Sequence, residues 1–169
     1  MMNSNVWAGC SHIILLWMML FTPHLLALDR EQAAIEQLIA SKSPPIGVVF
    51  EIVGGNDKTL LAALKRSEHY IAQLKQQYPR LKFVIISHGY EQFSLQTSHQ
   101  AQHLILHDQV QQMVQNENVP LQVCGALARN ESVKASAFPD YVEVVSSGPQ
   151  AIQNYIQQGY QLIEMSVIE

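Results

Sequence analysis

The chain has 169 residues, of which 48% are apolar and only 14% are charged. This length suggests one domain of ordinary size. The high apolar content and the net charge of −4 exclude a disordered chain. Ten Lys and Arg residues stand against 14 Asp and Glu residues, and no basic run occurs, so no nucleic-acid partner is expected.

The first 27 residues contain no Asp, Glu, Lys or Arg, and charged residues begin directly after Leu28. The apolar run at 13–21 is followed by Pro23 and is shorter than the roughly 20 residues that a membrane-spanning helix needs. The pattern predicts a signal peptide over 1–27, with Ala27 at the cleavage site, and export to the periplasm. An uncleaved membrane anchor and a wrongly assigned start are the alternatives.

Segments with strand and helix patterns alternate along the rest of the chain. An N-terminal helix and linker are expected over 28–45, before a single domain at 46–169. The run 46–53 is almost continuously apolar, which is typical of a strand buried on both faces, and 82–87 is expected to be a second buried strand. Further strands are expected at 119–124, 141–145 and 160–165. This alternation with helices predicts an α/β protein, a three-layer α/β/α sandwich with a mostly parallel five-stranded sheet of the flavodoxin-like type.

Several helix boundaries carry their own signals. Gly54-Gly55-Asn56-Asp57 predicts a turn in which Asn56 is the N-cap of the next helix. Pro149 suits the first turn of the last helix, and Gly159 is expected to end it.

Small and polar residues follow the expected strands, at the edge where an open parallel sheet binds its ligands. The candidate binding residues at this edge are Asn56, His88, Gly89, Gly125, Arg129 and Ser147. Their convergence is the most informative functional feature of the sequence. His88 either contacts a ligand and exchanges a proton near neutral pH, or hydrogen-bonds within its own loop.

Cys124 is the candidate catalytic residue, because it ends the third strand and precedes a helix that begins near Gly125. Backbone N–H groups at such a position favour the thiolate, which is the reactive form of cysteine, and Arg129 adds a cation. After cleavage Cys124 would be the single cysteine, so no intramolecular disulfide is expected. The residues leave two roles open: a reactive thiol, or a small buried hydrophobic side chain.

His99, His103 and His107 recur at four-residue spacing. On a helix they would share one face, where such pairs can bind Zn or Cu. The segment around His99 is polar and no cysteine or carboxylate completes the set, so a solvated helix face is favoured over a metal site. No glycine-rich nucleotide motif is present, and no cofactor is expected.

Three stretches in order resemble the DsrE/DsrF-like family, which includes sulfur-relay proteins and small YchN-type proteins. Ser87-His88-Gly89 resembles an apolar strand that closes on His-Gly. The stretch 119–129 resembles the strand and helix around the cysteine that bears persulfide in relay members, and 146–160 resembles the closing strand–helix–strand unit. The resemblance covers the chain from about Ile46 to Met165.

The resemblance implies an α/β/α domain that assembles into homo-oligomers, either trimers or hexamers. It also implies that Cys124 accepts sulfane sulfur from a donor protein and passes it to an acceptor, as a carrier of the sulfurtransferase kind. Two other functions stay open: a non-catalytic, homo-oligomeric binding module in the periplasm, and a periplasmic metal binder that uses the three histidines.

Overall fold

The structure is a computed structural model that describes residues 23–165. Most of the expected leader at 1–27, including Cys10, lies outside the described residues. Within them, no helix has the length and apolar character that crossing a membrane requires.

Helices and strands alternate as the sequence predicts. The helices are α1 (Pro23–Ala40), α2 (Asp57–Gln77), α3 (Leu104–Gln115), α4 (Gly125–Asn130) and α5 (Gly148–Gln157). The strands are β1 (Gly47–Ile52), β2 (Lys82–Ser87), β3 (Leu121–Cys124), β4 (Glu143–Val145) and β5 (Tyr160–Met165). Short 3-10 helices, which the sequence analysis did not predict, lie at η1 (Tyr90–Leu95), η2 (Thr97–His99) and η3 (Ala135–Ala137).

The five strands form one sheet in the order β4-β3-β2-β1-β5, and all neighbours are parallel. The predicted fold class is therefore confirmed, and the sheet is wholly rather than mostly parallel. Parallel strands end at the same edge, so the polar residues that follow them are gathered there.

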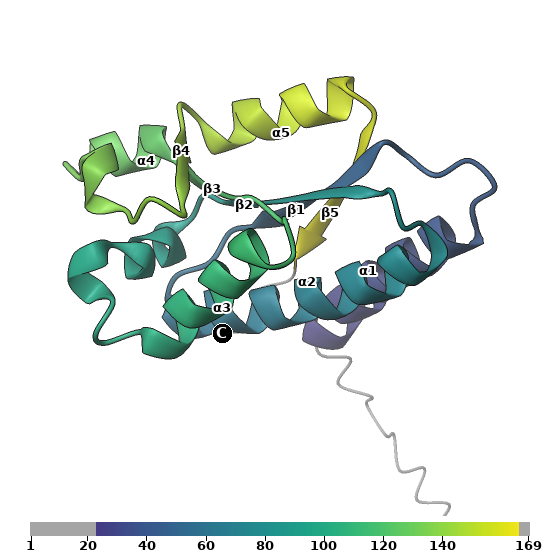
Figure 1. Ribbon diagram of the computed structural model, residues 1–169, viewed down its shortest axis with the longest axis horizontal. Coiled ribbons are helices and arrows are strands. Elements are labelled where there is room, and N and C mark those ends of the chain that lie inside the picture. Colours follow the sequence, from purple (N-terminus) through teal and green to yellow (C-terminus); the bar gives the residue numbers. More distant parts are fainter. Residues whose placement is uncertain (1–22, 166–169) are drawn as a thin grey trace, which may run out of the picture.

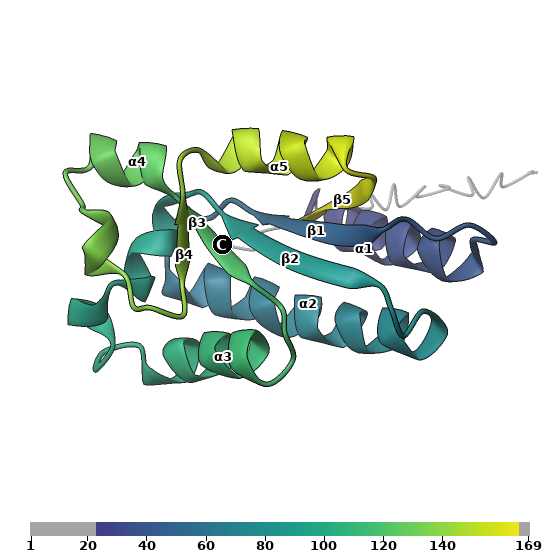
Figure 2. The same ribbon diagram turned by 45° about the horizontal axis from the view of Figure 1, so that its top comes forward.

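The two faces of the sheet are covered unequally (Figures 1 and 2). Helices α1, α2 and α3 lie on one face, where they bury a large apolar core that includes Phe50, Leu64 and Ile71. Helices α4 and α5 lie on the other face. The apolar cluster there is small, with Val49, Val84, Ile86 and Ile152 as its buried members.

Local signals set the helix ends as expected. Asn56 caps α2: its side chain accepts a hydrogen bond from the Thr59 N–H (3.1 Å), and the Thr59 hydroxyl accepts one from the Asn56 N–H (3.3 Å). Pro149 lies in the first turn of α5. Gly159 has φ of +91°, a left-handed conformation that glycine adopts without steric cost.

Candidate functional site

His88 and Cys124 are neighbours at the carboxyl edge of the sheet. Ser87 and Val123 are register partners on β2 and β3, so the next residues on the two strands lie side by side. Both contact Gly148, the first residue of α5. A Cβ added to Gly148 would lie 2.6 Å from the Cβ of His88 and 3.4 Å from the Cβ of Cys124. Only glycine allows the start of α5 to approach these two side chains so closely.

The thiol of Cys124 accepts hydrogen bonds from two backbone N–H groups. Gly148 donates from 3.3 Å and Leu127 from 3.5 Å, and Cys124 is the N-cap of α4 as the sequence predicts. The residue is 5% exposed. Both donors are backbone N–H groups, and a sulfur anion accepts such bonds more strongly than a neutral thiol does.

A carboxylate holds the imidazole of His88. The Nε2 of His88 lies 2.6 Å from Oε1 of Glu51 on β1, and both side chains are largely buried. Glu51 therefore fixes the position of the ring at the edge of the sheet. The sequence analysis did not single out Glu51, although a lone acid within an otherwise apolar strand is the signal that could have found it.

The side chain of Gln92 holds the backbone of Cys124 in place. Its Oε1 accepts from the Cys124 N–H (2.7 Å), and its Nε2 donates to the Cys124 carbonyl (3.3 Å). Gln92 is fully buried in η1. The amide thus continues the hydrogen-bond ladder between β2 and β3 beyond the last register pair.

The neighbouring Glu91 joins the ends of β1 and β2. Its carboxylate accepts from the Gly54 N–H (2.6 Å), the Ser87 hydroxyl (2.7 Å) and the Gly89 N–H (3.0 Å). A side chain on Gly89 would collide with this carboxylate. The sequence analysis placed Gly89 at the site but missed Glu91 and Gln92, since no short-range pattern marks a 3-10 helix that folds back under a strand end.

The remaining candidate residues lie at the same edge but do not all face the sulfur. Arg129 donates from Nη2 to the Ser146 carbonyl (3.2 Å), and its guanidinium lies against Gly125. Ser147 is the N-cap of α5, and its side chain makes no capping bond. The side chain of Asn56 is engaged in capping α2.

The expectation that His99, His103 and His107 share one solvated helix face is wrong. His99 lies in η2 and His103 precedes α3, so only His107 is helical. His107 is buried, and its Nε2 donates to the Ser94 carbonyl (3.1 Å) while its Nδ1 accepts from the Tyr141 hydroxyl (2.6 Å). Burial lowers the pKa of His107 from its ordinary value of 6.5.

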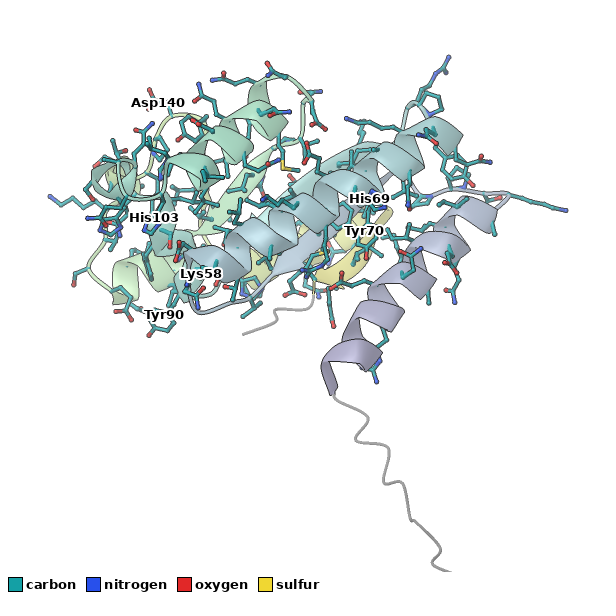
Figure 3. All side chains as sticks on the ribbon, turned by 90° about the horizontal axis from the view of Figure 1, so that it is seen from below. Lys58, His69, Tyr70, Tyr90, His103 and Asp140 are labelled. Atoms are coloured by element: carbon teal, nitrogen blue, oxygen red, sulfur yellow. The ribbon has the colours of Figure 1, made fainter. Side chains whose placement is uncertain are left out.

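The other two histidines also have protein partners. His103 lies 3.1 Å from the Asp57 carboxylate, and His99 contacts the Phe93 carbonyl at 3.0 Å. Figure 3 shows His103 toward the same end of the molecule as Lys58 and Tyr90. Among residues 23–165, no group of three His, Cys, Asp or Glu residues is arranged to hold a metal ion.

Comparison with known proteins supports the fold and leaves the family open. No protein family and no curated protein matches the sequence. The fold is similar to that of a solved protein of unknown function, MTH1491 from Methanobacterium thermoautotrophicum, with 18% identity and a TM-score of 0.54. The match covers 69% of this chain and 96% of that chain. At this identity the likeness concerns the fold alone.

Proposed function

We propose that the protein carries sulfane sulfur as a persulfide on Cys124. The observation that carries the proposal is the convergence of the Gly148 and Leu127 N–H groups on Sγ, at the edge of the sheet where ligands bind. Loading needs a thiolate that attacks and an adduct that remains stable. The two backbone donors serve both needs, because they stabilise negative charge on the sulfur atoms.

The transfer exchanges one sulfur–sulfur bond for another. The Cys124 thiolate attacks the terminal sulfur of a donor persulfide R–S–SH, so the donor S–S bond breaks and R–S⁻ leaves. A new S–S bond gives Cys124–S–SH, and delivery to an acceptor thiolate repeats the exchange. Neither step needs an added oxidant or reductant.

His88 is suited to assist this exchange through its charge and its proton. The carboxylate of Glu51 orients the ring from one side, as a carboxylate does for an imidazole beside a nucleophile. His88 and Cys124 both flank Gly148, so a proton on His88 would favour the delivery step, in which the Cys124 thiolate is the leaving group. We assign His88 the role of steadying that charge, and Glu51 the role of a positioning residue.

The proposal includes export to the periplasm and assembly into a homo-oligomer, a trimer or a hexamer, with donor and acceptor proteins as partners. Assembly would bury exposed apolar side chains such as Val53 and Tyr90, which are 51% and 57% exposed and follow the ends of β1 and β2. Light scattering of the purified protein and its N-terminal sequence test these two parts, and a monomer or an intact leader in the soluble fraction would contradict them.

Intact mass under non-reducing conditions tests the carrier function. The chain has two cysteines, so the experiment uses a Cys10→Ser background in which Cys124 is the single thiol. Polysulfide should add one sulfur atom per chain, and Cys124→Ser should abolish the gain while the domain stays folded. His88→Asn and Glu51→Gln should slow loading without abolishing it. If Cys124 gains no sulfur, or reacts with iodoacetamide only after denaturation, the proposal is wrong.

A non-catalytic binding module is the second candidate function. The observation that favours it is the burial of Cys124, whose two hydrogen bonds would equally suit a structural thiol. This function predicts that Cys124→Ser leaves oligomerisation and ligand binding unchanged. It also predicts that the thiol of the native protein is no more reactive than a free thiol.

A further inference from the structure

A cavity of about 410 Å3 lies beside α4, between that helix, the turn that follows it and β4. Its walls are mainly apolar, formed by Ala128, Val133, Ala135 and Val144. Its volume falls within the range of about 300–1,000 Å3 that is typical of sites for small molecules. Gly125, which directly follows Cys124, is also part of the wall.

Two cationic side chains, Arg129 and Lys134, line the same cavity, and no acidic residue does. Within the described part of the chain, neither cation forms an ion pair with a carboxylate. The acid at the end of α4, Glu131, accepts the Tyr90 hydroxyl at 3.0 Å. Arg129 and Lys134 are thus two exposed cations at the cavity that have no direct carboxylate partner among residues 23–165.

The backbone that forms the wall has an uncommon conformation. Ser132 has φ of +60°, in the left-handed region that favours glycine. The turn is closed by a hydrogen bond from the Val133 N–H to the Ala128 carbonyl (2.7 Å). It places Ser132, Val133 and Lys134 along one wall of the cavity. A left-handed residue closed by such a bond is the Schellman motif that commonly ends an α-helix, so this wall of the cavity is a well-formed helix end.

We propose that this cavity binds a small organic anion, a carboxylate or sulfonate joined to a short apolar chain. The two cations would attract negative charge in a ligand, and the apolar walls would bury a hydrocarbon body. A bare inorganic anion would leave the walls in contact with water, and a neutral lipid would leave the cations unpaired. Arg129 is anchored by the Ser146 carbonyl, so its guanidinium is held in place before the ligand arrives.

Titration of the full chain with hexanesulfonate, followed calorimetrically and by amide NMR shifts, tests the site. The amides of Gly125, Ser132 and Val133 should shift, and hexanol and sulfate should each bind more weakly than hexanesulfonate. The double variant Arg129→Gln/Lys134→Gln should weaken binding by about tenfold, because two charge-assisted contacts at a partly exposed site are lost.

A matched control separates this site from general attraction to positive charge. Arg80→Gln/Lys82→Gln removes the same two residue types, both exposed, near the start of β2, and should leave hexanesulfonate binding unchanged. Ala135→Phe fills the cavity but keeps both cations, so it should weaken hexanesulfonate more than sulfate. Equal losses in the two double variants, or no shift at the cavity amides, would overturn the proposal. No sulfur donor is present, so the result is independent of persulfide loading on Cys124.

Discussion

The two faces of the sheet differ in how much apolar surface they bury and in which side chains they carry. On the face covered by α1, α2 and α3, long helices bury a continuous core that extends from Ile35 to Met165. On the face covered by α5 and α4, the apolar cluster is small and the strand ends carry Glu51, His88 and Cys124. One face therefore supplies most of the buried apolar surface, and we call it the thick face. The other, the thin face, holds the side chains that could take part in chemistry.

The difference shows how a sheet of this size accommodates a polar site. Burying a carboxylate or an imidazole costs free energy unless it is paired, and the pairing between Glu51 and His88 limits that cost. The large core on the opposite face provides the stability that allows the thin face to be polar. Because Gly148 has no side chain, the start of α5 can lie directly against His88 and Cys124.

Matched truncations on the two faces should give the largest effect. Ile71 in α2 is 0% exposed and Ile152 in α5 is 3% exposed, so the two side chains are alike in type, secondary structure and burial. Ile71→Ala should cost about 4 kcal/mol and Ile152→Ala about 2 kcal/mol in free energy of unfolding, because the densely packed face cannot collapse around the new cavity. Urea unfolding measures both, and equal losses would mean that the thin face is packed as rigidly as the thick one.

The next largest effect concerns the two hydrogen bonds by which the Gln92 side chain holds the backbone of Cys124. Gln92→Leu keeps the volume of the side chain but leaves the buried N–H and carbonyl of Cys124 without partners, which should cost about 2–3 kcal/mol. Amide hydrogen exchange at Cys124 should become faster. Gln96→Leu in the same segment removes one partly buried bond to Phe93 and serves as the control, with a loss below about 1 kcal/mol. A stable Gln92→Leu variant with slow exchange would show that the strand end needs no clamp.

Apolar runs and caps account for how much of the fold could be predicted. The bounds of β2 and β5 agree with the predicted ranges: β2 is an apolar run that ends at His88-Gly89, and β5 begins directly after Gly159. The order of the strands had no such signal, since local patterns do not specify which parallel strands are neighbours. At the site, the proximity of His88 and Cys124 followed from the rule that parallel strands end at one edge.

The rest of the site depends on tertiary contacts that a local pattern does not contain. Gln92 and Glu91 reach the strand ends only because η1 folds back beneath them. The spacing of the three histidines predicted one helical face, but α3 begins only at Leu104, and His99 lies in the separate 3-10 helix η2. Tertiary packing therefore overrode the periodicity, and it buried His107 instead of exposing it.

His107 makes the thick face sensitive to acid. Burial lowers its folded-state pKa, with His103 and His99 acting in the same direction, while the hydrogen bond to the Ser94 carbonyl and the charge of Asp108 oppose the shift. Below its ordinary pKa of 6.5, the unfolded chain binds the proton and the folded chain does not. The stabilising contribution is therefore complete above about pH 6.5 and is lost as the pH falls toward the folded-state pKa.

Chemical unfolding across this pH range tests the prediction. His107→Gln should lose about 1–2 kcal/mol at neutral pH, since both hydrogen bonds are disturbed, and its stability should fall less steeply in acid. The exposed His69→Gln is the control and should keep the slope of the wild type. An unchanged slope in His107→Gln would place the acid sensitivity elsewhere.

The smallest effect concerns backbone conformation at the edge of the thin face. Ser132, with φ of +60°, forms the cavity wall, while Asn118, with φ of +56°, lies in the turn before β3. The left-handed region costs a residue with a Cβ about 1–2 kcal/mol, whereas glycine in the unfolded chain costs about 0.5–1 kcal/mol of entropy. Ser132→Gly should therefore stabilise the protein by about 0.5 kcal/mol. Asn118→Gly should change stability less, because asparagine adopts this conformation more readily than serine. Thermal unfolding of both variants decides the matter: a larger gain at Asn118 would mean that no strain is concentrated at the cavity, and that the turn after α4 is held by its hydrogen bonds alone.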